Sequence, residues 1–411
     1  MPLKIAMQGR SARHAIKVFV GERVFGPLLR RWLLERKGSA RRLVSAFPAD
    51  TARIGYRNVF PSVKIPRCEP VMHCEGDLGR AYLNQIRSAG DQATGEAGVI
   101  TARKVDVSFP IGMHRCGGQV FAQALLADYV LANPRYVIDL ERLPLRRKRT
   151  GVSEAVLLTL PWHHNFYHWM VEILPRLGLC DSLPELQGLP LLVARSSPRF
   201  VRESLALTGY LDRALFLDDG AYRFEKLHFP TRLAPASQAS PLAVEWLRRK
   251  VPALPPSNPV RRLYISRRDA KIRSVANEAE VEAALADLGF IKVVPSEHSL
   301  SRQIELFRNA DIVVGSHGAA FANLAFAKAG TAIIEVFEPG HFNPAYTRIA
   351  AINCLRYAFL VGRKRSLGVS IDVPQLRQMV AGLCAVEGGL AALRLLTLTK
   401  DPPCKAGSQM C

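Results

Sequence analysis

The sequence predicts an α/β protein of two domains, and three observations carry this prediction. The chain has 411 residues, which is enough for two domains that each bury a core. Beyond residue 260, short apolar runs alternate with helical patterns, as in a parallel, doubly wound sheet. The Pro-rich stretch VPALPPSNPV interrupts the chain before that alternation and indicates a domain boundary. We expect an N-terminal segment at 1–45, an α/β domain at 46–250 and a second α/β domain at 251–411.

The N-terminal segment differs from the rest of the chain. From Ile16 onward, apolar residues recur every three or four positions with Lys and Arg between them. This spacing predicts a basic amphipathic helix, which Pro27 would kink or split. A helix of this kind with Trp32 on it can lie in a membrane interface. The alternative is a helix packed on the protein with its basic face in solvent.

The first α/β domain becomes regular only at residue 155. The apolar runs 155–160 and 189–194 predict buried strands on either side of a helical segment. Further short strands are expected at 214–218 and 225–230. Residues 46–150 contain Pro, Gly and charge without a sustained period, and they predict no element.

The second α/β domain alternates clearly between strands and helices. Strands are expected at 262–267, 290–294, 311–316 and 331–337. Three helical patterns lie between these strands. The first is marked by Val281, Ala284, Leu285 and Leu288, the second is short and contains Ile304 and Phe307, and the third consists of small residues from about Gly318. Sheets of this type bind ligands at the carboxyl ends of their strands.

Composition limits the classes of partner and compartment. The formal net charge of +21 implies anionic partners, such as phosphates, anionic lipid or nucleic acid. Nucleic acid is disfavoured, because no zinc-finger spacing, RNP-like motif or K homology loop occurs. No apolar run reaches the roughly 18 to 20 residues that cross a bilayer, and the N-terminus lacks the features of a secretory signal. The eight cysteines are scattered without a C-x-x-C pair, so reduced thiols are expected rather than disulfides or structural zinc.

Three histidines lie close together in the stretch at 160–177, LPWHHNFYHWMVEILPRL. On a helix, His164, His168 and Glu172 would share one face, because residues four apart are neighbours there. The pattern is compatible with a metal site, with an acid/base site and with a buried aromatic cluster that happens to contain histidine.

Two stretches of the second α/β domain suit phosphate. In DIVVGSHGAAFANLAF (311–326), a buried strand leads through His317, Gly318 and Ala319 into a helix, whose first N–H groups and dipole favour an anion. The motif is neither G-x-G-x-x-G nor a Walker loop, and small residues also serve tight helix–sheet packing. The second stretch follows the strand at 262–267 and carries Arg267, Arg268, Lys271 and Arg273. Arginine forks match phosphate oxygens, whereas a solvated basic loop is the alternative.

An acid also occurs late in the apolar strand at 331–337. A carboxylate in such a place is costly unless it is paired or hydrogen-bonded. Glu335 is expected to accept hydrogen bonds from ribose hydroxyls or to pair with a nearby arginine.

The order and spacing of these motifs resemble glycosyltransferase family 61. The resemblance covers about residues 150–340, and residues 1–150 gain nothing from it. The matching positions are Asn165, Tyr167, His168, Trp169, Glu172, Pro175, Arg176, Leu177, Arg267, Arg268, Arg273, Asn277, Glu278, Gln303, His317, Gly318, Ala319, Asn323 and Glu335.

The resemblance implies a GT-B fold, with two Rossmann-like, doubly wound domains that face a cleft. It also implies inverting transfer from a nucleotide sugar, often UDP-linked, to a hydroxyl of a glycan or lipid-linked acceptor, without an essential metal or a cofactor. The sequence has no D-x-D motif, the pair of acids that holds the metal in other glycosyltransferases. Arginines and a helix N-terminus would neutralise the diphosphate instead.

One departure from the family concerns location. Eukaryotic relatives are lumenal with an N-terminal membrane anchor, and no such anchor is found here. This favours a bacterial type that acts in capsule or exopolysaccharide synthesis. We expect a cytoplasmic protein that can also attach peripherally to an anionic membrane surface. We expect no nucleic-acid partner.

The resemblance also suggests roles for the matched residues. Inverting transfer needs one general base, which is either His168 or Glu172, with the other orienting it. Asn165, Tyr167 and Arg176 would lie on the acceptor side. The expected diphosphate ligands are Arg267, Arg268, Arg273, His317, Gly318 and Ala319, and the expected nucleoside contacts are Asn323 and Glu335.

Two rival functions remain at this point. One is a zinc hydrolase that uses His164, His168 and Glu172, although H-E-x-x-H is absent. The other is a catalytically inactive nucleotide-binding or scaffold protein.

Overall fold

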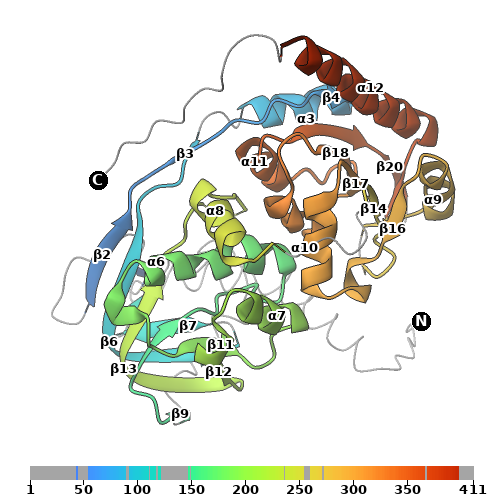
Figure 1. Cartoon of the computed structure of the whole chain (residues 1–411). Helices are drawn as coiled ribbons and strands as arrows, with labels where there is room; N and C mark the ends of the chain where they lie inside the picture. The colour runs from blue at the N-terminus through green and yellow to red at the C-terminus, as the bar shows by residue number, and fades with distance from the viewer. Residues whose placement is uncertain are drawn as a thin grey trace, which may run out of the picture.

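The computed structural model shows a mixed α/β protein with two main sheets that lie side by side (Figure 1). It describes residues 43–44, 54–88, 92–110, 112–116, 119–121, 147–148, 150–235, 237–253, 260–270, 273–365 and 368–397. The amphipathic helix predicted in the first 45 residues and Lys271 lie outside these ranges. None of the helices in the described ranges combines the length and apolarity that a bilayer crossing requires.

The first sheet has ten strands and is mixed. Its order is β1 (Leu43–Val44), β8 (Gln119–Phe121), β7 (Met113–Cys116), β6 (Ala97–Phe109), β13 (Gly220–Pro230), β10 (Glu154–Leu157), β11 (Leu191–Ala194) and β12 (Ala214–Leu217), while β2 (Ile54–Phe60) pairs with β6 and β9 (Arg147–Lys148) with β13. The four predicted strands form its parallel part, β13-β10-β11-β12. The other part is mainly antiparallel, since β6 runs against β13, β2 and β7, although the short strands β1 and β9 pair in parallel with β8 and β13. A doubly wound sheet was expected here, and only this parallel half resembles one.

Helical segments connect the parallel strands of the first sheet. They are η4 (His168–Ile173), η5 (Leu174–Arg176) and α6 (Leu177–Asp181), then η6 (Pro184–Leu186), α7 (Arg199–Leu207) and η7 (Leu211–Arg213). Helix α8 (Pro241–Lys250) follows β13 and leads toward the second sheet (Figure 1).

The second sheet has six strands, all parallel. Its order is β16 (Ile291–Val293), β14 (Arg262–Ile265), β17 (Ile312–Ser316), β18 (Ala332–Phe337), β19 (Arg356–Val361) and β4 (Met72–His73). Every residue of β17 and β18 is buried, as expected for strands covered on both faces. The four predicted strands of this domain are confirmed, whereas β19 was not predicted.

The connections of the second sheet are largely helical. They include α9 (Glu278–Ala286), η8 (Pro295–Glu297), α10 (Leu300–Asn309), η9 (Ala319–Phe326), α11 (Ala345–Ile352) and α12 (Val373–Thr397). The small-residue helix predicted after Gly318 is the 3₁₀ helix η9. A small three-stranded sheet of β15 (Ser274–Val275), β21 (Gly368–Ser370) and β20 (Arg363–Arg365) lies beside them.

The strand order of the second sheet contains a reversal that positions a ligand site. From β14 the chain moves outward to β16 at the edge, then returns to β17 on the other side of β14. In open parallel sheets, ligands bind at such a switch point, in the crevice outside the carboxyl ends of the strands. The segments that follow β14 and β17 therefore define the expected site.

An arm of the chain connects the two sheets before residue 150. It leaves after β2 and returns into β6, and its two sides pair through β3 (Lys64–Ile65) and β5 (Gln92–Ala93). Between them, β4 pairs with β19, and α3 (Asp77–Ser88) packs nearby, so that the arm reaches the second sheet (Figure 1). The Tyr82 ring of α3 lies edge-on to Phe337, 5.7 Å between centroids. Residues 46–150 thus contribute to both sheets.

The hydrophobic core is continuous between the two sheets. One cluster of buried side chains includes Val156 of β10, Trp169 of η4, Leu247 of α8 and Val313 of β17. A second cluster, with Ile100, Val107 and Phe224 among its members, covers the other face of the first sheet. The shared cluster holds the two sheets together on the side where the site lies.

Candidate active site

A pocket of about 650 Å³ lies between segments from both sheets. On the side of the second sheet it is lined by residues that follow β14, β17 and β18, including Ser266, Arg267, Arg273, Ser316, His317, Gly318, Ala319, His341 and Tyr346. On the side of the first sheet its lining residues are Trp162, Asn165, Phe166, Tyr167, His168, Phe200 and Ser237. The pocket therefore sits at the switch point of the second sheet and brings both predicted motifs together.

His168 is held by Glu172 at the start of the π-helix η4. The distance from His168 Nδ1 to Glu172 Oε2 is 2.9 Å. Asn165 prepares this helical turn, because its Oδ1 accepts hydrogen bonds from the Tyr167 and His168 amides at 2.9 and 3.4 Å. With an ionised Glu172, Nδ1 carries the proton and Nε2 keeps a lone pair. His168 lines the pocket and Glu172 lies behind it.

The Glu172 carboxylate has partners on both oxygens. Its Oε1 accepts a hydrogen bond from the Ser237 amide at 2.6 Å, and Arg232 Nη1 lies 3.6 Å from Oε2. A buried carboxylate is stable when its oxygens are bonded and a cation is near. Glu172 is therefore fixed as the group that orients His168.

The other two histidines of the cluster lie apart from this pair. His163 is buried, and its Nδ1 bonds the Leu160 carbonyl at 3.2 Å. Burial lowers the pKa of His163 to about 4, so the ring is neutral at pH 7. His164 is exposed. Within the described ranges, no three histidine, cysteine or acidic side chains form a group that fits a metal ion, and this includes His164, His168 and Glu172.

Arg267 and Gly318 fit together on the opposite wall. A Cβ added to Gly318 would lie 1.7 Å from Arg267 Nη1, so only glycine leaves room for the guanidinium. Arg267 Nε donates to the Arg273 carbonyl at 3.1 Å. Burial, and then the charge of Arg273, lowers the pKa of Arg267. An anion bound in the pocket would raise the pKa of Arg267 again, because a nearby negative charge favours the charged guanidinium.

Arg273 and His341 extend this cationic wall. Arg273 Nη1 contacts His341 Nε2, and burial followed by the charge of Arg273 lowers the pKa of His341. His317 lies next to both, with its ring 5.8 Å from that of His341. Four basic side chains therefore gather on the side of the second sheet.

His317 is held by a carboxylate as well. Its Nδ1 lies 2.5 Å from Glu335 Oε1, and the Tyr357 hydroxyl donates to Glu335 Oε2 at 2.5 Å. Glu335 is fully buried and does not line the pocket. The predicted contact of Glu335 with a nucleoside does not fit this geometry, because its side chain points to β19 and to His317. Its position is that of a group that orients His317.

Three further predicted residues lie away from the pocket surface. Arg176 is buried and donates to the carbonyls of Pro230 (2.7 Å), Ile173 (3.3 Å) and Leu158, which ties the ends of β13 and β10 together. Arg268 is exposed and paired with Glu297. Asn323 is buried and donates to Gln303 Oε1 at 3.2 Å, so Gln303 separates it from the pocket.

The matched pair Asn277 and Glu278 supports the loop after β14. Glu278 Oε1 accepts hydrogen bonds from the hydroxyls of Ser266 (2.7 Å) and Tyr264 (3.2 Å). Asn277 exchanges two hydrogen bonds with the backbone of Ile371, both at 2.9 Å. Glu278 thus fixes the start of the loop that carries Arg267, and Asn277 ties the end of that loop to Ile371.

Backbone strain is concentrated at the pocket. In the described part of the chain, five residues other than glycine have positive φ, and three of them line the pocket: Trp162 (φ 69°), Ser237 (φ 59°) and Arg273 (φ 58°). Such residues persist only where the surrounding structure holds them, and they cluster at active sites and ligand clamps.

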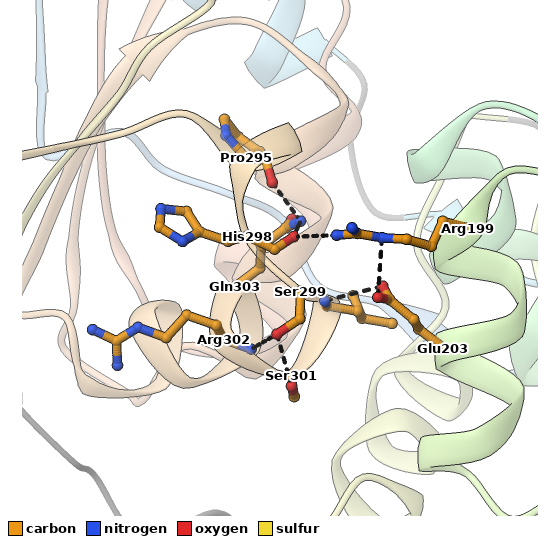
Figure 2. Close-up of polar contacts among 9 residues, drawn as sticks. Arg199, Glu203, Pro295, His298, Ser299, Ser301, Arg302 and Gln303 are labelled. Atoms are coloured by element: carbon orange, nitrogen blue, oxygen red, sulfur yellow. Dashed lines mark hydrogen bonds and ion pairs between the residues drawn. The ribbon is translucent and has the colours of Figure 1, made fainter.

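Helix α7 is tied to the segment before α10 at the rim of the pocket (Figure 2). Arg199 Nη2 donates to the His298 carbonyl at 2.9 Å, and Glu203 Oε2 accepts from the Leu300 amide at 3.1 Å. Gln303 holds the same segment by donating to the carbonyls of Pro295 and His298 at 2.8 and 3.3 Å. These contacts set the position of the first sheet's helices relative to Pro295 and Gln303, which line the pocket.

Several lining residues were not predicted as site residues. His341 follows β18 in the stretch FEPGHFNP, at the ligand edge of the sheet, and the same reasoning that selected His317 applies to it. Ser237 and Phe200 carry no such signal, because they reach the pocket through loops and helices of the first sheet.

Comparison with known proteins finds similarity in the part of the chain that forms most of the pocket. Residues 166–334 match the family model described as Glycosyltransferase 61, within the region that carries the resemblance. The chain is also similar to the EGF domain-specific O-linked N-acetylglucosamine transferase of Drosophila melanogaster, at 34% identity over 113 residues. That match covers 27% of this chain and 21% of the Drosophila protein, so the chain spans only about a fifth of that relative.

Proposed function

We propose that this protein is an inverting glycosyltransferase that moves a sugar from a nucleotide sugar to an acceptor hydroxyl. The observation that carries the proposal is one pocket with an oriented histidine on one wall and a cluster of basic groups on the other. A group-transfer reaction needs a base near the nucleophile and positive charge near the leaving group. The match to the Glycosyltransferase 61 model over residues 166–334 supports the same reaction class.

His168 acts as the general base in this proposal. Its Nε2 takes the proton of the acceptor hydroxyl while the hydroxyl oxygen attacks the anomeric carbon. The new C–O bond forms as the bond to the diphosphate oxygen breaks, and the electron pair leaves with the nucleoside diphosphate. Attack opposite the leaving group inverts the anomeric configuration. Glu172 orients the ring and stabilises the imidazolium, as the acid does in other carboxylate–histidine pairs.

The leaving diphosphate binds the wall of the second sheet. Arg267 and Arg273 match its oxygens as forks, and His317 adds a third donor. The amides of Gly318 and Ala319 at the start of η9 complete the site. This set of donors compensates the charge without a metal ion, which is consistent with the missing D-x-D motif. Arg268 and Glu335 have other partners, so they are not part of this set.

The finer assignments extend the same proposal. The two sheets correspond to the two halves of a GT-B protein, since the pocket takes its lining from both. We propose a UDP-linked donor. Because the Drosophila protein is named an N-acetylglucosamine transferase, UDP-N-acetylglucosamine is the first donor to test. A glycan or lipid-linked acceptor of a bacterial polysaccharide, at the cytoplasmic face of an anionic membrane, remains our proposal for the acceptor and location.

A turnover assay tests the reaction. The protein is incubated with a panel of methyl glycosides as acceptors and with UDP-N-acetylglucosamine, UDP-glucose, UDP-galactose or UDP-xylose, and UDP release is measured with and without EDTA. We expect release in both conditions, and a roughly 10²-fold or greater loss of turnover in His168→Ala and Glu172→Gln. UDP should still raise the Tm of both variants as it raises that of the wild type. Glu245→Gln, in an exposed ion pair of α8, is the matched control.

Different outcomes point to the rival functions. Near wild-type turnover in both variants would show that the base is misassigned. A Tm increase with UDP but no turnover of any sugar nucleotide would support an inactive nucleotide-binding protein. Loss of activity in EDTA, restored by zinc, would support a metal-dependent reaction.

A further inference from the structure

We propose that Trp162, Phe166 and Phe200 form an aromatic platform that stacks a neutral sugar ring of the acceptor beside His168. This inference rests on the proposed function, and it names the chemical class of the second substrate. The three side chains are half-buried, and all three line the pocket on the side of the first sheet.

The platform lies next to the group that takes the acceptor proton. The ring centroids of Trp162 and His168 are 4.5 Å apart. Phe166 is two residues before His168 in the same turn, and its ring meets Phe200 of α7 edge-on, 5.2 Å between centroids. A ring stacked on these side chains would place its hydroxyls near His168 Nε2.

The backbone at Trp162 is held in a conformation that bulky residues rarely adopt. Its φ is 69°, and its carbonyl accepts a hydrogen bond from the Asn165 amide at 2.8 Å, which closes the turn. Packing in a core does not require this strain, since an unstrained turn would also bury an indole. Strain that persists at a pocket is better explained by the orientation of the side chain toward a ligand.

The charges of the two walls separate the two substrates. Among the lining residues on the side of the first sheet, only His168 can carry a charge. The basic groups Arg267, Arg273, His317 and His341 all lie on the other side, where Asp269 is the one acid among the lining residues, so basic groups are in excess there. A diphosphate therefore belongs to the second sheet's wall, and the first sheet's wall suits an uncharged ligand.

Polar groups beside the aromatic rings match the hydroxyls of a sugar. The Oδ1 of Asn165 is used by two backbone amides, so its exposed Nδ2 group is oriented as a donor. The Ser237 hydroxyl also lines the pocket, next to the amide that holds Glu172. A sugar ring has an apolar C–H face and a rim of hydroxyls, and it fits aromatic rings with a few donors around them. A phosphate offers no such face.

The test compares acceptor use with donor use. Transfer from the donor that shows turnover is measured with methyl β-D-glucopyranoside, methyl β-D-galactopyranoside, methyl β-D-xylopyranoside and a serine-containing peptide. We expect transfer to at least one glycoside and none to the peptide. Trp162→Ala and Phe200→Leu should each raise the acceptor KM about tenfold. The donor KM and the Tm increase with UDP should stay unchanged, and Trp162→Phe should restore most of the acceptor affinity.

Each other outcome counts against the platform. An unchanged acceptor KM in Trp162→Ala and Phe200→Leu overturns it, as does an equal loss of donor and acceptor affinity. Transfer by the wild type to the peptide but to no glycoside also overturns it, and so does donor hydrolysis without transfer to any glycoside. In these cases UDP release by the wild type leaves the proposed function standing, whereas absence of UDP release would remove the proposed function itself. Phe200→Leu keeps an apolar side chain of similar size. Among the described residues the Phe200 ring packs on Phe166 and not on His168, so this variant separates the loss of stacking from a disturbance of the base.

Discussion

Two of the three histidines that line the pocket are each bonded through Nδ1 to a buried glutamate. His168 is held by Glu172 on a helical turn, and His317 is held by Glu335 on a strand. Aromatic rings pack against both histidines, whereas a basic neighbour distinguishes His317: its ring lies 5.8 Å from that of His341, which contacts Arg273. In our proposal, the same pairing of residue types serves proton transfer on one wall and anion binding on the other.

Gly318 makes room for the Arg267 guanidinium, and this gives a sharp test. In Gly318→Ala the new Cβ would lie 1.7 Å from Nη1, so Arg267 must move. Because charged hydrogen bonds contribute about 1.5–3 kcal/mol, UDP affinity should fall about tenfold or more. The measurement is the UDP dissociation constant by calorimetry. Gly188→Ala is the control, since nothing lies within 4 Å of its added Cβ. Unchanged affinity in Gly318→Ala would remove Arg267 from the diphosphate site.

His163 predicts how stability depends on pH. Its pKa is about 4 in the fold and ordinarily 6.5, so between these values the unfolded chain binds a proton that the folded chain does not. Stability from this residue is complete above pH 6.5 and falls as the pH drops toward 4. From pH 7 to pH 5 the loss is about 2 kcal/mol.

Urea unfolding at the two pH values measures this effect. The wild type should lose more free energy of unfolding than His163→Gln does, and comparing the two cancels the other titrating groups. Equal losses in both proteins would show that His163 is protonated in the fold.

Residue-level roles were only partly predictable from the sequence. His168, His317, Gly318, Arg267 and Arg273 were selected because they follow strands or share a helical face, and all five line the pocket. Glu335 was selected for its place late in a strand, and Asn323 and Arg176 through the family resemblance, yet all three bond neighbours behind the pocket. A pattern gives the element and the end at which a residue lies, whereas the partner of a buried polar side chain depends on tertiary packing.

At the scale of elements, the contact between α7 and the start of α10 sets the pocket rim (Figure 2). Glu203 accepts from the Leu300 amide, which is one of the first N–H groups of α10 and has no partner within that helix. Ser299 caps the same helix through the Arg302 amide at 3.3 Å. A side chain of one sheet's helix thus completes the cap of a helix in the other.

Removing this second cap should cost stability. Glu203→Ala leaves the Leu300 amide without its carboxylate, and loss of a cap typically costs about 1 kcal/mol. The free energy of unfolding in urea measures this. Glu245→Ala is the control, because Glu245 makes only an exposed pair with Arg249 at 3.7 Å, for which little effect is expected. If both variants unfold alike, the Glu203 contact does not stabilise the protein.

Elements with a local pattern were predictable, and those defined by distant pairing were not. β17 and β18 are short apolar runs with both faces buried, which the sequence shows directly. β6 shows no alternation of apolar and polar residues, because both faces of the strand are buried at its two ends. Its partner β13 lies more than 100 residues away, so their pairing could not be read from a local pattern either. α3, of 12 residues, does carry a helical spacing through Tyr82, Leu83 and Ile86, so this helix could have been predicted from its local pattern.

At the scale of the molecule, the two sheets share one hydrophobic cluster. Parts that share a core unfold together, because neither keeps its buried surface alone. Differential scanning calorimetry should therefore show one transition rather than two, and UDP should shift that whole transition upward. Two resolved peaks, of which UDP moves one, would show that the two sheets are separate folding units.

The arm before residue 97 limits how the protein can be recombined. Because β4 completes the edge of the second sheet, a fragment that begins at the Pro-rich boundary would leave the backbone of β19 open to other chains. A chimera that exchanges the second sheet for that of a relative must carry residues 61–96 with it. The unit of exchange in this fold is consequently discontinuous in sequence, and any ligand preference of the second sheet would be transferable only as two pieces of chain together.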